Sequence, residues 1–262
     1  MIFGEFDSRD ASGIVLAHSV DLGARKLRKG QLLGDEDLEA LNGAGITSIR
    51  GARLQDADVG EDEAARKLAR LLAGKNTEAG EAAAGRCDIR ATVSGLALVE
   101  PEAIDRLNAL DESITIATLP PYCPVQAGKI VATVKIITFA VRNETLDRAC
   151  QAVSMPRPLR VAGFGCRRTA LIVSDSPDDG ERRPDLAVTS TRNRLEAMEN
   201  RLALVLKSGH DVHSIGAMIH QALAAGCDLL LIAGATATQD RKDVIPRAIE
   251  LCGGKIVHFG IP

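Results

Sequence analysis

The chain has 262 residues, of which 32 are basic and 35 acidic, and its formal net charge is −3. This balance gives no reason to expect a polyanion as the main partner, so nucleic-acid binding is disfavoured. Aromatic residues make up 2% and tryptophan is absent, which leaves almost nothing for base-stacking platforms or aromatic sugar sites.

The sequence also lacks the features of membrane and secreted proteins. No apolar stretch approaches the roughly 20 residues of a membrane span. The N-terminal residues 1–7 have neither the basic nor the apolar region of a signal peptide. The six cysteines form no Cys-x-x-Cys pair and have no histidine at metal-ligand spacing, which predicts reduced thiols. We therefore expect a cytoplasmic protein with no membrane partner.

Residues 1–158 are predicted to form a mixed α+β region, which begins with strand and helix segments. A short helix is expected over residues 35–45, with Asp35 as its N-cap and glycine past its end. A longer helix is expected over residues 60–72, where apolar side chains follow the helical period. Residues 74–85, rich in alanine, glycine and glutamate, are predicted to form an exposed loop.

From residue 86 to 141 the pattern is mostly β and predicts a small β-rich, barrel-like subdomain. It includes a hairpin-like stretch over residues 124–135. Helices are expected over residues 101–110 and 144–153. Two prolines in Met155–Leu159 hold the backbone extended, so the domain boundary is placed between residues 158 and 159.

Residues 159–262 are predicted to form an α/β domain with a doubly wound parallel sheet, because strand and helix patterns alternate regularly there. The expected strands and helices are Thr169–Val173, a helix from Thr189 to about Glu199, Leu202–Leu206, a helix after Asp211, Leu229–Ala233, a helix from Val244, and Lys255–Phe259. A sheet of this type usually continues with another loop and helix. The domain is therefore expected to be small or cut short at Pro262.

The strand, loop and helix of Asp228–Ile249 form the predicted binding site. Ligands of parallel sheets lie beyond the carboxyl ends of the strands, where helix amides and loop side chains converge. Small residues in the loop would let a ligand approach the backbone. A second polar segment, which could also form a plain turn, follows the first strand and includes Ser176. The predicted cofactor-binding residues are Gly234, Ala235, Thr236, Asp240, Asp243, Ser174 and Asp175.

Asp243 and Asp211 are the predicted catalytic and metal-binding residues. Each follows a strand and precedes a helix, so both are expected at the same edge of the sheet. Two carboxylates from neighbouring strand ends would suit Mg²⁺ that bridges phosphate oxygens. The alternative is that each carboxylate only caps its helix.

Residues 231–250 resemble the signature of the molybdenum-cofactor biosynthesis domain, the molybdopterin-binding module. They read Leu-Ile-Ala-Gly-Ala-Thr-Ala-Thr-Gln-Asp-Arg-Lys-Asp-Val-Ile-Pro-Arg-Ala-Ile-Glu. In that family a buried strand is followed by a Gly-Gly-Thr-Gly-like loop and then by Arg-Asp at the start of a helix. Gly234 to Thr238 and Asp243 match those places, and the resemblance covers residues 167–262.

Short motifs before residue 158 resemble accessory regions of molybdopterin molybdotransferases. They are Gly13–Ser19, Leu27–Gly30 and the helix from Asp37 to Ile46. The chain as a whole resembles the N-terminal half of bacterial two-part proteins, in which such a module precedes a nucleotidyltransferase acting on molybdenum cofactor.

The resemblance implies that the cleft binds the dithiolene and phosphate of molybdopterin, with adenylylation or Mg²⁺-dependent molybdate insertion in active members. Two glycines of the family loop are replaced by Ala235 and Ala237, which add side chains where backbone would face phosphate. Ser174–Pro177 stands in place of the Thr-Gly-Asp-Glu-Leu loop of the molybdotransferases. These departures favour binding over catalysis.

Three functions are consistent with the sequence. The first is a molybdopterin-binding protein of cofactor maturation, which delivers the pterin to a partner transferase or a molybdoenzyme. The second is a transferase in which Asp211 and Asp243 place Mg²⁺. The third is a non-catalytic assembly module with a vestigial cleft. The expected partners are the pterin, a nucleotidyltransferase domain or molybdoenzyme, and further copies of the chain in a homo-oligomer.

Overall fold

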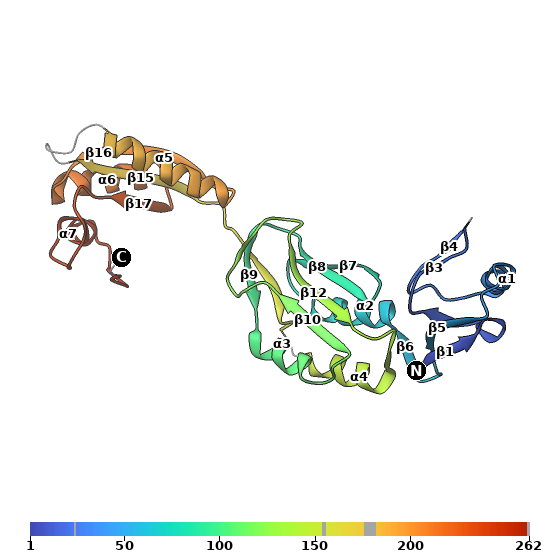
Figure 1. The fold of residues 1–262 in the computed structure, drawn as a ribbon. Helices are drawn as coiled ribbons and strands as arrows, with labels where there is room; N and C mark the ends of the chain where they lie inside the picture. Colours follow the sequence, from blue (N-terminus) through green and yellow to red (C-terminus); the bar gives the residue numbers. More distant parts are fainter. Residues whose placement is uncertain (24, 154–155, 176–181, 261–262) are drawn as a thin grey trace. The chain divides into compact units, whose positions relative to one another are not determined.

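The computed structural model describes residues 1–23, 25–153, 156–175 and 182–260. The chain divides into two compact units, Met1–Gly163 and Phe164–Pro262 (Figure 1). The boundary predicted at residues 158 and 159 falls at the start of β14 (Leu159–Gly163), which pairs antiparallel with β9 (Gly95–Val99) of the first unit. Met155, in the predicted linker, lies outside the described residues.

The first part of unit 1 is a small sheet with one helix, which we call the N-terminal module (residues 1–53). Its central strand, β5 (Ser48–Arg53), pairs antiparallel with β1 (Ile2–Asp7) and β2 (Ile14–Leu16). The other elements are η1 (Ser8–Asp10), β3 (Val20–Asp21), β4 (Lys26–Leu27) and α1 (Asp35–Gly43). The module has its own core of buried side chains, made of Ala11, Ile14, Leu16, Leu27, Leu33, Leu41 and Ile49.

The rest of unit 1 is β-rich and contains several small antiparallel sheets. The strand orders are β10-β12-β8-β7, β11-β9-β14 and β13-β6. The strands not yet given are β6 (Asp58–Gly60), β7 (Thr77–Ala83), β8 (Arg86–Ala91), β10 (Ile114–Thr118), β11 (Pro124–Val125), β12 (Ile130–Ile136) and β13 (Ala140–Arg142). Each sheet keeps two edge strands, so the described residues form open sheets and not the predicted barrel-like subdomain.

Three helices complete unit 1: α2 (Glu61–Leu72), α3 (Pro101–Asn108) and α4 (Asn143–Ala152). α2 packs against β7, β8 and β12 because its alanines and leucines share one face of the helix. Leu68 and Leu72 on this face are fully buried in the same core as Ile89 of β8 and Val134 of β12. Burial of this apolar face is the main stabilising contribution of the helix.

Unit 2 contains the one parallel sheet of the described structure. Its central strand, β15 (Arg168–Asp175), lies between β16 (Arg201–Gly209) and β17 (Leu229–Ala233). The helices α5 (Arg182–Ala197), α6 (Val212–Ala224) and α7 (Val244–Leu251) follow the three strands in turn (Figure 1). The main core of the unit consists of Ala170, Ile172, Leu206, Ile215, Ile219, Ala222, Cys227 and Ala248.

The prediction of a doubly wound parallel-sheet domain is wrong. The sheet has three strands, and only β15 is buried along most of its length, whereas alternate residues of β16 are exposed. β17 is an edge strand of this sheet, and its Leu229 is 37% exposed, so the strand is not buried on both faces. The expected fourth strand, Lys255–Phe259, has no regular secondary structure, and Val257 is 88% exposed. A short apolar run fits an edge strand as well as a central one, and periodicity does not separate them.

The structure also bears on two features considered in the sequence, membrane-spanning segments and the state of the cysteines. In the ranges that the structure describes, no helix is long and apolar enough to cross a membrane. The six cysteines, all described, are free thiols, with Cys87 and Cys227 buried and Cys166 exposed.

Candidate functional site at the carboxyl edge of the parallel sheet

The carboxyl ends of the three parallel strands lie side by side at one edge of the sheet, which we call the carboxyl edge. Asp175 at the end of β15 is in register with Gly209 at the end of β16. Val173 is in register with Ala233, the last residue of β17. Loops that leave parallel strands converge at this edge, so it is where binding residues of the unit are expected.

Three side chains from three segments are hydrogen-bonded across the carboxyl edge. Ser174 Oγ in β15 lies 2.9 Å from His210 Nδ1, and His210 Nε2 lies 2.9 Å from Thr236 Oγ1. Ser174 is 2% exposed, His210 is half-buried and Thr236 is exposed. We call these residues the Ser174–His210–Thr236 bridge. The bridge connects the ends of all three strands and runs from the core of the unit to its surface.

The sequence predicts Ser174 and Thr236 as site residues but does not predict His210. His210 directly follows the last residue of β16. Ser174 and Thr236 are predicted because they lie at or after the ends of their strands, and His210 meets the same criterion. Its position after a strand was therefore the signal for its role.

The loop after β17 is organised by the carboxylate of Asp243. Asp243 Oδ2 accepts hydrogen bonds from the backbone amides of Gln239 and Asp240, the second at 3.0 Å. These amides, together with the nearby His210, hold the pKa of Asp243 below its ordinary value. Asp243 occupies the N-cap position of α7, but its side chain makes no capping bond there. The carboxylate therefore stabilises the loop, and the first amides of α7 have no side-chain cap.

Asp240, Gly234 and Ala235 also hold the loop in place. Asp240 Oδ1 accepts from the backbone amide of Lys242 at 2.5 Å, and the amide of Ala235 donates to Ser174 Oγ at 3.3 Å. A Cβ atom at Gly234 would lie 2.6 Å from Ile245 Cδ1 and 3.1 Å from the backbone oxygen of Thr236. Packing of the loop against α7 thus explains the glycine without a ligand.

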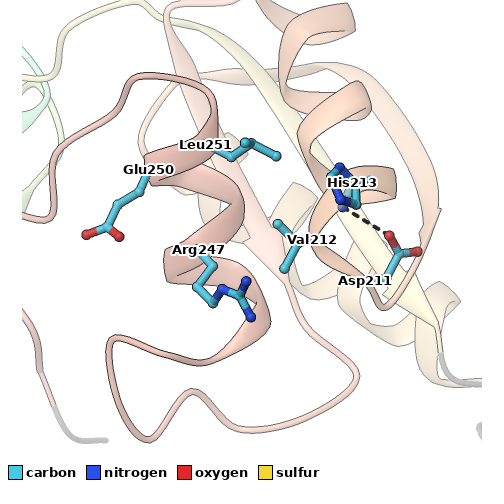
Figure 2. Close-up of a pocket in the computed structure, with 6 residues that line it drawn as sticks. All are labelled: Asp211, Val212, His213, Arg247, Glu250 and Leu251. Carbon is cyan, nitrogen blue, oxygen red and sulfur yellow. Dashed lines mark hydrogen bonds between the residues drawn. The ribbon is translucent and has the colours of Figure 1, made fainter.

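Asp211 caps α6 and lines a separate cavity. Asp211 Oδ1 accepts from the backbone amides of His213 and Ser214 at 3.0 and 2.9 Å. The side chain of Ser214, together with these amides, lowers the pKa of Asp211. Asp211 also lines a cavity of about 480 Å³ between α6 and α7. Figure 2 shows the side chains that line it. The cavity is lined by Asp211, Val212, His213, Arg247, Glu250 and Leu251. None of the other predicted site residues is in that lining.

The structure thus brings some of the predicted residues together and places others elsewhere. Ser174, Ala235 and Thr236 are joined by hydrogen bonds, and Asp243 lies close to His210. The half-buried Asp175 ends β15, and Ser176 lies outside the described residues.

The predicted Mg²⁺ has no cluster of ligands among the described residues. No group of three or more histidine, cysteine, aspartate or glutamate side chains in that part of the chain is arranged to hold a metal. Asp211 and Asp243 each use one carboxylate oxygen to accept two backbone amides. Both residues therefore have a structural role that does not require a metal.

Comparison with known proteins identifies a match to the N-terminal part of the chain. A family model described as a domain of unknown function (DUF8806) matches residues 5–59, which include most of the N-terminal module. No curated protein and no solved structure matches the chain. The comparisons supply no function for the carboxyl edge.

Acidification is expected to release the loop after β17 from Asp243. Because the pKa of Asp243 is lowered in the folded chain, its stabilising contribution is complete above the ordinary aspartate pKa of about 3.9. The contribution is lost as the pH falls through the lower, folded value. The amide NMR shifts of Gln239 and Asp240 should follow this titration from about pH 6 to 2. Asp243→Asn should abolish the transition, and a midpoint above about 3.9 would contradict the assignment.

Proposed function

We propose that unit 2 binds molybdopterin at the carboxyl edge, as part of molybdenum-cofactor maturation or delivery. The observation that carries the proposal is the Ser174–His210–Thr236 bridge. It holds the loop of residues 234–243 on the sheet edge, and that loop is the segment that resembles the molybdopterin-binding signature. The bound pterin would pass to a transferase or a molybdoenzyme.

The polar groups at the carboxyl edge suit the chemistry of such a ligand. Phosphate oxygens accept hydrogen bonds, and the donors for them are Thr236 in the loop and the uncapped amides before Pro246 at the start of α7. A pterin ring carries amino and amide N–H groups, for which the ionised Asp243 is an acceptor. Donors and acceptors for both halves of the ligand thus come from one loop and the helix that follows it.

These contacts favour binding over metal-dependent transfer. Asp211 is bonded to the amides of α6, and Asp243 is bonded to those of its own loop. Neither residue belongs to a metal-binding cluster in the described ranges. Mg²⁺ and a transferase activity are therefore not part of the proposal.

Titration with molybdopterin under anaerobic conditions tests the proposal. The full chain should quench or enhance the pterin fluorescence in a saturable way. Asp243→Ala should weaken binding by about tenfold or more, since it removes the acceptor that orders the loop.

Glu196→Ala is the matched control for this titration. Glu196 is exposed in the last turn of α5, which leads to the start of β16 and hence to the opposite edge of the sheet. The control variant should bind like wild type. Equal affinities of wild type and Asp243→Ala would show that the proposed site is wrong.

A further inference from the structure

We infer that His210 is a positioning residue, whose Nε2–H tautomer makes the Thr236 hydroxyl a hydrogen-bond donor to a phosphate oxygen of the ligand. The part that concerns the ligand rests on the proposed function. The part that concerns the tautomer rests on the hydrogen bonds of the bridge alone.

The buried serine determines where the proton of the imidazole lies. A serine hydroxyl has one proton to donate and two lone pairs. The amide of Ala235 uses one lone pair of Ser174 Oγ. Ser174 is 2% exposed, and a buried hydroxyl proton without an acceptor is costly. Among the described residues, His210 Nδ1 lies at 2.9 Å from Ser174 Oγ as an acceptor, so Ser174 donates to Nδ1.

The bond from Ser174 also determines the direction of the hydrogen bond between His210 and Thr236. A neutral imidazole that accepts at Nδ1 carries its proton on Nε2. His210 Nε2–H then donates to Thr236 Oγ1 at 2.9 Å. The hydroxyl proton of Thr236 is consequently left for another acceptor, and Thr236 is exposed. The bridge therefore presents a donor at the carboxyl edge.

The direction of the hydrogen bonds in the bridge determines whether Thr236 can bind an acceptor or a donor group of the ligand. With Nε2–H, Thr236 presents a proton, which matches an oxygen of a phosphate. With the opposite tautomer, Thr236 would donate to Nε2 and would present lone pairs, which match a ligand N–H group. The tautomer of His210 thus determines the specificity of the site, although His210 acts on the ligand only through Thr236.

Long-range ¹H–¹⁵N NMR spectra of the full chain with ¹⁵N-labelled histidine test the tautomer directly. The spectra are recorded at mildly alkaline pH. His210→Gln identifies the His210 signals by their loss. We expect the Nε2–H pattern, and Ser174→Ala should convert it to a mixture of tautomers. An Nδ1–H pattern in the wild type would overturn the inference.

A double-mutant cycle with molybdopterin as the probe tests the role of His210. Thr236→Val and His210→Ala should each weaken binding by about tenfold, and the double variant by no more than either single one. Thr236→Ser, which keeps the hydroxyl, should stay within about threefold of wild type. Additive losses of about a hundredfold would show that His210 does not act through Thr236.

The two experiments separate the inference from the proposed function. Absence of molybdopterin binding by the wild type would reject the proposed function, and the ligand contact of Thr236 with it. The spectra decide the tautomer in either case. Binding with the Nδ1–H tautomer would keep the proposed function and reject the inference.

Discussion

Gly51→Ala is expected to destabilise the N-terminal module by at least about 2 kcal/mol, because the new methyl group has no space. A Cβ atom at Gly51 would overlap Ile14 Cγ2 and would lie 2.5 Å from the backbone oxygen of Val15. Both obstacles belong to β2, which pairs with β5 beside Gly51. The backbone oxygen cannot move away without loss of that pairing. The substitution should therefore separate β2 from β5.

Gly4→Ala is the matched control, because Gly4 lies directly opposite Gly51 in the β1–β5 pair. A Cβ atom at Gly4 would have no neighbour within 4 Å. This variant should change the stability by less than about 1 kcal/mol. Hydrogen exchange of the β5 amides measures the local free energy of opening in both variants. Equal exchange in the two variants would contradict the packing of β2 on β5.

Helices in unit 1 are the elements that the sequence predicts best. The predicted ranges 60–72, 101–110 and 144–153 correspond to α2, α3 and α4. Each of these helices buries an apolar face, so the helical period is visible without knowledge of the partner. The start of α1 is displaced by one residue, since Gly34 is the N-cap and Asp35 is the first helical residue.

Strand pairing in unit 1 could not be read from local patterns. Residues 74–85 were expected to be a loop, but β7 forms there and pairs with β8. The hairpin-like stretch 124–135 does not form a hairpin, because β11 pairs with β9 whereas β12 pairs with β8 and β10. In both cases the partner strand lies elsewhere in the sequence, and strand propensity depends strongly on that partner.

The sequence predicts those residues of the candidate site that lie at or directly after the ends of strands. Ser174 and Thr236 follow from the rule that parallel sheets bind ligands at their carboxyl edge. The hydrogen bonds of His210 to both of them depend on the distance between loops and have no sequence pattern. The cap at Asp211 was the alternative to its metal role, and the structure shows the capping bonds. The position of an aspartate before a helix is thus not enough to predict metal binding, which also requires other ligands nearby.

Ile172→Ala is expected to destabilise unit 2 by about 2–5 kcal/mol. Ile172 lies in the central strand β15 and is 0% exposed. It packs in the core with Leu206 of β16, Ile215 of α6 and Ala248 of α7. β15 is paired with β16 on one side and with β17 on the other, so its backbone cannot shift easily to close the cavity left by alanine. Since Ser174 is two residues further along β15, the bridge should be weakened as well.

Val205→Ala is the matched control, since Val205 lies in the neighbouring strand β16 and is 38% exposed. Removal of two methyl groups from this partly solvated face should cost about 1 kcal/mol or less. The chain has two compact units, which can unfold in separate transitions. Hydrogen exchange of the β15 amides is the appropriate measurement, because it reports the opening of unit 2 alone. Ile172→Ala should increase that exchange at least about tenfold more than Val205→Ala does. Similar exchange in both variants would show that β15 is not the central buried strand on which the carboxyl edge depends.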